Sequence, residues 1–166
     1  LSLRLLRYIN SAANALPQRV SSIENAITLL GREKLYRWLI LLVCSADSHN
    51  ERGGAALETA LVRGRMMELL GEGRSAAERD SLFLVGLLSL IDVILQVPLD
   101  KALAPLALSP DIDAALRSSR GPLFPLLELA IACERADGEA MRSAAERTGI
   151  EPEQASECHM QALSWA

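Results

Sequence analysis

The stretch Leu82-Phe83-Leu84-Val85-Gly86-Leu87-Leu88-Ser89-Leu90-Ile91-Asp92 is almost wholly apolar and predicts a helix in the centre of the fold. Its flanking residues extend the expected helix from about Ala76 to Val97. No part of the chain alternates apolar and polar residues with period two over a useful length, which argues against a sheet. Leu and Ala, both strong helix formers, dominate the apolar residues. The sequence therefore predicts an all-α protein.

Length, composition and charge limit the class of protein. The 166 residues fit one domain, and the formal net charge of −4 is not that of a nucleic-acid-binding surface. The cysteines Cys44, Cys133 and Cys158 are far apart and odd in number, which is typical of reduced thiols in a cytoplasmic protein. No apolar run reaches the roughly 20 residues of a membrane-spanning helix, and no signal peptide is recognisable.

Pro, Gly and capping residues divide the chain into helical segments. Ser21 can cap a helix in which Glu24 completes a capping box, whereas the polar stretch 48–54 predicts a loop. Several later segments carry Pro at or near the first turn, where its missing N–H is tolerated. The expected helices cover residues 1–15, 22–30, 32–46, 55–70, 76–97, 99–104, 110–118, 122–135, 138–148 and 152–165. Because apolar residues lie at helical spacing from Leu3 onward, we expect a fragment of a longer protein.

Three motifs resemble known families. Residues 5–12, LLRYINSA, are similar to the LL-x-x-(I/V)-N-S-A helix of HDOD domains, the HD-related output domains of bacterial signalling. Residues 20–31, VSSIENAITLLG, are similar to a second HDOD motif, I-x-S-(I/V)-x-x-A-(I/V)-x-x-L-G, at the matching distance. Residues 86–90, GLLSL, resemble the core helix of the HD phosphohydrolases, which reads Leu-Leu-His-Asp-Ile-Gly. Ser89 and Leu90 stand where those enzymes carry the His-Asp pair.

The resemblance implies a single HD-like, HDOD multi-helix bundle over residues 1–166, without enzymatic activity, catalytic residues, metal or cofactor of its own. Residues 82–92 and Ala162-Leu163-Ser164-Trp165 resemble the HDOD subgroup that follows an EAL domain, the cyclic di-GMP phosphodiesterase module. The implied partners are an attached EAL or other regulatory domain and other signalling proteins. Two alternatives stay open: a degenerate metal-dependent phosphohydrolase acting on a nucleotide, and a helical nucleotide-binding sensor. The oligomeric state also stays open.

The histidines and the third cysteine suggest catalytic sites that the spacing does not favour. His49, His159 and Asp92 could supply a two-His-one-carboxylate site, but HD enzymes need more ligands than these three. Cys158 and His159 are neighbours on a predicted helix, so their side chains project about 100° apart and do not form a dyad. With Ala155 and Ala162, Cys158 forms a small-residue stripe that predicts packing.

Two further features have structural explanations. The run 71–77, GEGRSAA, imitates a dinucleotide-binding fingerprint, but it follows a helix rather than a strand, so we expect a helix stop and a new cap. Asp92 interrupts an apolar segment, and an unpaired buried carboxylate is costly. We expect Asp92 either to reach solvent or to pair with an arginine such as Arg63 or Arg65.

A basic zone on the first helices is the candidate interaction surface. Arg4, Arg7, Arg32 and Arg37, together with Arg19 and Lys34, can bind carboxylates or phosphates. Aromatic residues for base stacking are not interleaved with them, which argues against RNA. Trp38 and Trp165 are expected to be core or domain-contact residues. Residues 76–166, in contrast, hold seven Lys/Arg and fourteen Asp/Glu.

Overall fold

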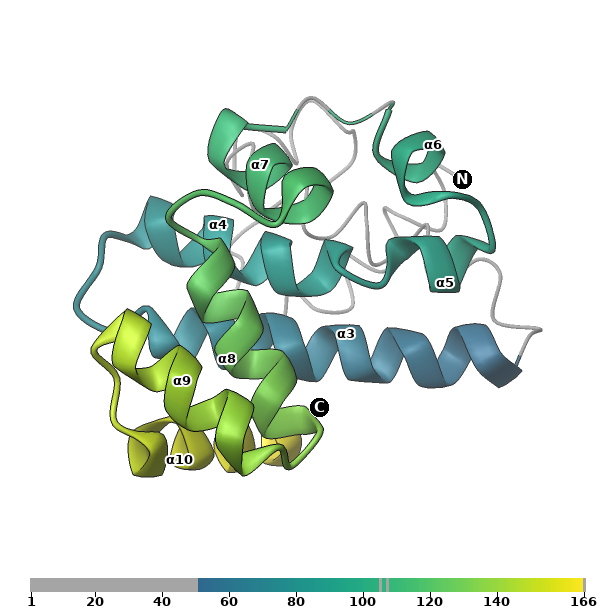
Figure 1. The fold of residues 1–166 in the computed structure, drawn as a ribbon. Coiled ribbons are helices and arrows are strands. Elements are labelled where there is room, and N and C mark those ends of the chain that lie inside the picture. The colour runs from purple at the N-terminus through teal and green to yellow at the C-terminus, as the bar shows by residue number, and fades with distance from the viewer. Residues whose placement is uncertain (1–50, 105, 107, 166) are drawn as a thin grey trace, which may run out of the picture. The chain divides into compact units, whose positions relative to one another are not determined.

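The computed structural model describes residues 51–104, 106 and 108–165 of the protein. Every regular element among these residues is a helix, which confirms the predicted all-α fold (Figure 1). The helices are α3 (Glu51–Leu70), α4 (Ala76–Leu88), α5 (Ile91–Leu95), α6 (Leu99–Leu103), α7 (Pro110–Ser118), α8 (Phe124–Glu134), α9 (Gly138–Thr148) and α10 (Pro152–Trp165). None of these described helices combines the length and the apolar character that crossing a membrane requires.

The helices α3 and α4 form the centre of the described structure. The turn at residues 71–74 reverses the chain, and the two helices lie side by side in Figure 1. All residues from Leu82 to Leu88 are buried, as the sequence predicts for this apolar stretch. On α3, Met66 and Met67 are also fully buried. The apolar stretch therefore packs against α3 as the predicted central helix.

Two glycines allow α3 and α4 to touch backbone to backbone. A Cβ atom on Gly86 would lie 2.6 Å from both the Cα and the N of Gly64. A Cβ atom on Gly64 would lie 2.9 Å from the carbonyl oxygen of Phe83. Real Cβ atoms do not approach backbone so closely, so a side chain at either position would force the helices apart.

The prediction of a single helix from Ala76 to Val97 is wrong, because α4 ends at Leu88 and a second helix begins at Ile91. The hydroxyl of Ser89 donates a hydrogen bond to the carbonyl oxygen of Gly86 at 2.6 Å, which satisfies one of the acceptors left free at a helix end. Leu90 then has the non-helical dihedrals φ −123° and ψ 15°, and the short helix α5 follows. Gln96, with φ 55°, ends α5 in the left-handed conformation.

The other helix boundaries agree more closely with the sequence. The bounds of α7, α9 and α10 are those predicted, and α8 is shorter than the expected 122–135. Pro110 lies at the start of α7 and Pro98 is the N-cap of α6, so prolines mark helix starts as predicted. The predicted loop over 48–54 is wrong in its second half, because α3 already begins at Glu51. Helix packing elsewhere in α3 outweighs the weak helix propensity of Gly53 and Gly54.

A capping box begins α4. The hydroxyl of Ser75 accepts a hydrogen bond from the backbone N–H of Glu78 at 3.3 Å, and the Glu78 carboxylate accepts one from the Ser75 N–H at 3.0 Å. The Ser75 hydroxyl also donates to this carboxylate at 2.6 Å. The run at 71–77 is therefore a helix stop followed by a cap, as predicted. First the hydroxyl bond and then the backbone bond hold the pKa of Glu78 below its ordinary value.

Replacing Gly86 by Ala should destabilise the protein, because the added methyl group meets the backbone of Gly64. We expect the free energy of unfolding, measured by urea titration, to fall by about 1–3 kcal/mol. The matched control is Gly138→Ala at the start of α9, where the nearest atom to the new Cβ is the flexible Nη1 of Arg142 at 3.7 Å. That variant should be as stable as the original protein or more stable. A Gly86→Ala protein of unchanged stability would contradict the close contact.

Replacing Glu78 by Gln should lower the free energy of unfolding at neutral pH and leave it unchanged in acid. Because the folded pKa of Glu78 lies below the unfolded one, its contribution is complete above the unfolded pKa and disappears as the pH falls through the folded pKa. Urea titrations of both proteins over a falling pH series measure the difference between them. A difference that does not change with pH would show that the carboxylate charge plays no part in the cap.

Candidate functional site

Arg63, in the middle of α3, lies against the point where α4 ends. It is 6% exposed, and among residues 55–104, 106 and 108–165 it is the only charged side chain that is buried. Its neighbour there is Ser89, the residue that caps the C-terminal end of α4 and stands where the resemblance to the HD enzymes places the His of the His-Asp pair. The third participant is Glu134, the last residue of α8. The residues brought together here are far apart in the sequence.

The guanidinium of Arg63 uses all three of its nitrogens. Nε donates to Oε2 of Glu134 at 3.0 Å, and Nη2 donates to Oε1 at 2.9 Å and to Oε2 at 2.8 Å. Nη1 donates to Oγ of Ser89 at 2.7 Å, and this hydroxyl in turn donates to the carbonyl oxygen of Gly86. We call this set of Arg63, Ser89, Glu134 and the Gly86 carbonyl the Arg63 bridge.

The Arg63 bridge compensates a buried positive charge. A guanidinium and a carboxylate in this two-pronged geometry form one of the strongest pairs available to side chains. The side chain of Glu134 is 30% exposed, so water still reaches one side of the pair. Exchanging such a pair for apolar residues is often neutral, whereas removing one partner leaves the other charge without compensation. The bridge thereby fixes α3, the end of α4 and the end of α8 to one another.

The residues of the Arg63 bridge do not fit the divalent metal of HD phosphohydrolases. Ser89 and Leu90 supply neither imidazole nor carboxylate, and the oxygens of Glu134 already accept hydrogen bonds from Arg63. A guanidinium held at this point also repels a second cation. Elsewhere in the described part of the chain, no three His, Cys, Asp or Glu side chains are grouped so that they could hold a metal ion. His49, one of the three hypothetical ligands, lies outside the described residues.

Asp92 is not brought to either of its two expected arginine partners. Arg63 pairs with Glu134, and Arg65 pairs with Glu68 at 3.0 Å. Asp92 lies half exposed in the first turn of α5, so the solvent alternative is the one that the structure supports. Pairing of Asp92 with Arg63 was the wrong alternative, because the break at Ser89 starts a new helix before Asp92 is reached.

Cys158 packs in the interior, as the small-residue stripe predicts. Ala155 and Ala162 are fully buried, Cys158 is buried beside them, and His159 is half exposed. Burial, followed by the negative charges of Glu72 and Glu157, raises the pKa of the Cys158 thiol. Burial also raises the pKa of Cys133. Both thiols are therefore protonated at neutral pH, which is unsuited to nucleophilic catalysis.

The candidate surface of Arg4, Arg7, Arg32 and Arg37 lies outside the described residues, as do Arg19, Lys34 and Trp38. Trp165 is within them and is 52% exposed, so it is not a core residue, and a domain-contact role stays a prediction. The guanidinium carbon of Arg65 lies 5.8 Å from the centre of the Trp165 ring, a cation–π contact that joins the end of α10 to α3.

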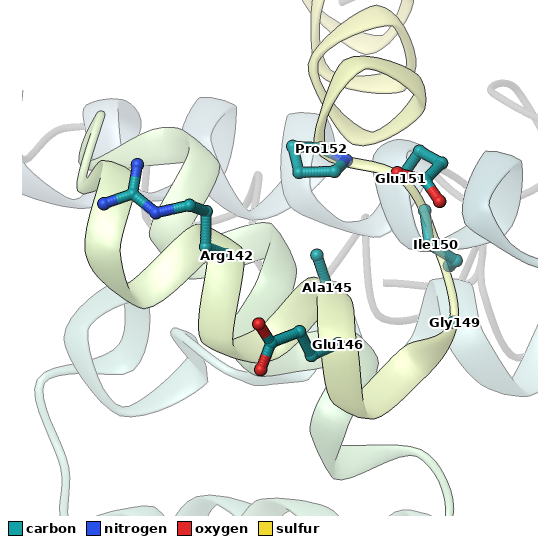
Figure 2. Close-up of a pocket in the computed structure, with 7 residues that line it drawn as sticks. All are labelled: Arg142, Ala145, Glu146, Gly149, Ile150, Glu151 and Pro152. Atoms are coloured by element: carbon teal, nitrogen blue, oxygen red, sulfur yellow. The ribbon is translucent and has the colours of Figure 1, made fainter.

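Two open hollows lie on the α8–α10 part of the structure. One, of about 450 Å³, is lined by Arg142 and Glu146 of α9 and by the turn into α10 (Figure 2). The other, of about 340 Å³, lies between α8 and α9, where Arg147 pairs with Glu128 at 3.1 Å. Both are lined by charges of mixed sign and contain no His or Cys. Neither arrangement suggests an acid–base or nucleophilic centre.

Comparison with known families identifies the class of protein. The HDOD domain family matches residues 1–106, and the chain belongs to this family. The chain is 29% identical over 168 residues to the protein YuxH of Bacillus subtilis (strain 168), a protein described as uncharacterized. It is 28% identical over 167 residues to the protein named cyclic di-GMP phosphodiesterase CdgJ of Vibrio cholerae.

These matches cover 99% and 100% of this chain but only 40% and 38% of the two relatives. The chain therefore spans about two fifths of the length of the curated relatives it matches. No solved structure matches it. The match to the HDOD family agrees with the family resemblance of the sequence motifs.

Replacing Arg63 by Met should destabilise the protein strongly, because Glu134 and Ser89 lose the donor that both accept from. We expect the free energy of unfolding to fall by about 3–5 kcal/mol. The double variant Arg63→Met/Glu134→Leu should recover part of this loss, since no charge is then left without a partner. Arg147→Met, which breaks a more exposed pair, is the control and should lose about 1 kcal/mol or less. Equal losses for Arg63→Met and Arg147→Met would contradict the role of the bridge.

Proposed function

We propose that this protein is a non-catalytic output domain of a bacterial signalling protein, which acts through contacts with an attached regulatory domain or with other signalling proteins. The observation that carries the proposal is the Arg63 bridge. Ser89 stands where the HD enzymes carry the His of their His-Asp pair, and its hydroxyl and the neighbouring Glu134 carboxylate are already bonded to the guanidinium of Arg63. Membership of the HDOD family supports the same conclusion.

We further propose that residues 1–166 form one domain of a longer cytoplasmic protein, in which an EAL domain or another regulatory domain is attached. The relative from Vibrio cholerae is named a cyclic di-GMP phosphodiesterase, and the present chain corresponds to 38% of it. Resemblance of residues 82–92 and 162–165 to the HDOD subgroup that follows EAL domains also supports this arrangement. Hydrolysis of cyclic di-GMP would then belong to the attached domain rather than to this one.

The proposed mechanism is transmission through a rigid body. The backbone contact between Gly64 and Gly86 connects α3 directly to α4, and the ion pair between Arg63 and Glu134 connects α3 to α8. A close-packed body of this kind moves as a unit when one of its surfaces is pushed. A change in contact at one face would therefore reposition the opposite face.

The proposal predicts that the isolated chain hydrolyses neither cyclic di-GMP nor nucleoside phosphates with Mg²⁺, Mn²⁺, Fe²⁺ or Zn²⁺. Product formation is followed by chromatography, and circular dichroism establishes that the assayed chain is helical. The matched variant Ser89→Ala, which removes the hydroxyl at the end of α4, should be equally inactive. Turnover that a chelator abolishes, together with stoichiometric bound metal, would refute a non-catalytic role.

A further inference from the structure

The helix α10 exposes two apolar side chains next to two carboxylates. Met160 is 65% exposed and Leu163 is 48% exposed, and residues three apart on a helix are surface neighbours. Glu153 and Glu157, both exposed, continue the same stripe at spacings of four and three residues toward Met160. We call Glu153, Glu157, Met160 and Leu163 the α10 face.

The α10 face is held in position by the opposite side of the helix. Ala155 and Ala162 are fully buried, and α10 packs on α3 and α8. The cation–π contact between Arg65 and Trp165 secures its last turn. Trp165 is therefore engaged by its own chain and is not part of the face. An apolar stripe on a helix fixed in this way is organised before a partner arrives.

The charges around the α10 face select the partner. Between its bounds α10 contains two Glu and neither Lys nor Arg, and its last turn carries no basic residue. The last turn of α10 has no basic residue of its own to offset the partial negative charge at the C-terminal end of the helix, although Arg65 of α3 lies over Trp165 there. A second copy that used its own α10 face would bring the same carboxylates to the contact, whereas a basic surface would be attracted.

The small size of the α10 face indicates how the partner is connected. Two partly exposed apolar side chains cover far less than the roughly 800 Å² that each partner of a stable interface buries. Such a contact is occupied only if the partner is tethered, because a linker raises its effective concentration to the millimolar range. We propose that the α10 face receives a basic amphipathic helix of a regulatory domain on the same polypeptide, an inference that rests on the proposed function.

Methionine oxidation in the complete natural polypeptide tests this proposal. Hydroxyl radicals convert exposed Met to its sulfoxide, which mass spectrometry locates. If the contact is closed about nine tenths of the time, Met160 should be oxidised about tenfold more slowly than when it is open. Leu163→Glu should remove this protection. Met66 and Met67, both fully buried, should stay protected in every variant that folds.

Charge reversal tests the chemistry of the partner. Glu153→Lys/Glu157→Lys should raise the oxidation rate of Met160 about tenfold if the contact then opens fully. Val93→Glu, which alters an exposed apolar residue on α5, is the matched control and should leave Met160 protected. If Met160 stays protected from oxidation after the charge reversal, the partner is not basic and the proposal is overturned. Protection that increases with protein concentration would assign the face to a second copy and overturn a tethered one.

Rapid oxidation of Met160 in the unaltered complete polypeptide would overturn the proposal that a partner covers the α10 face. This result would leave the proposed output role intact, because the hydrolysis assay tests that role separately. Conversely, metal-dependent hydrolysis by the isolated chain would refute the output role without any change in the protection of Met160. The two failures are therefore distinguishable.

Discussion

A guanidinium buried among helices needs a carboxylate within hydrogen-bond reach, and the described structure is arranged around that need. Glu134 meets it from the last residue of α8, while Ser89 occupies the remaining nitrogen from the end of α4. Both partners are end residues of helices, so the position of Arg63 also determines where two other helices stop relative to α3. The pairing of Arg63 thus both neutralises a buried charge and holds the ends of α4 and α8 against α3.

The same interaction leaves no free metal ligand among the groups that take part in it. Metal catalysis requires ligands that are free and coordinated positions that remain open. In the Arg63 bridge the carboxylate, the hydroxyl and the carbonyl are all committed to hydrogen bonds within the protein. The bridge holds three helices together, and the proposed output role places interaction with other molecules at the surface. The acidic, partly apolar side of α10 is the surface proposed above for such an interaction.

Local signals made much of the fold predictable. Pro110, Asp137, Gly149 and Pro152 mark helix ends through their own backbone chemistry, so the bounds of α7, α9 and α10 follow from nearby residues. The break at Ser89 was missed because it depends on a hydroxyl that also accepts from Arg63, 26 residues earlier. A hydrogen bond between residues this far apart in the sequence leaves no local pattern comparable to a helix cap.

The candidate site was harder to predict for the same reason. Arg63 was one of two arginines considered as partners of Asp92, should Asp92 not reach solvent, but its actual partner Glu134 is 71 residues away in the sequence. No periodicity or capping pattern connects the two positions. What the sequence did establish was the identity of Ser89 and Leu90, where the His-Asp pair of the HD enzymes would stand. Only the structure shows what Ser89 does at that position: its hydroxyl accepts a hydrogen bond from the guanidinium of Arg63.

The crossing of α3 and α4 carries an evolutionary consequence. Gly64 and Gly86 are both already the smallest residue, so neither can shrink to make room if the other gains a side chain. A larger residue at one of them has no compensating change at the other, unlike a pair of ordinary core residues, which can exchange volume. The two positions are therefore closed to gradual divergence, and a lineage that loses either glycine must adopt a wider helix spacing.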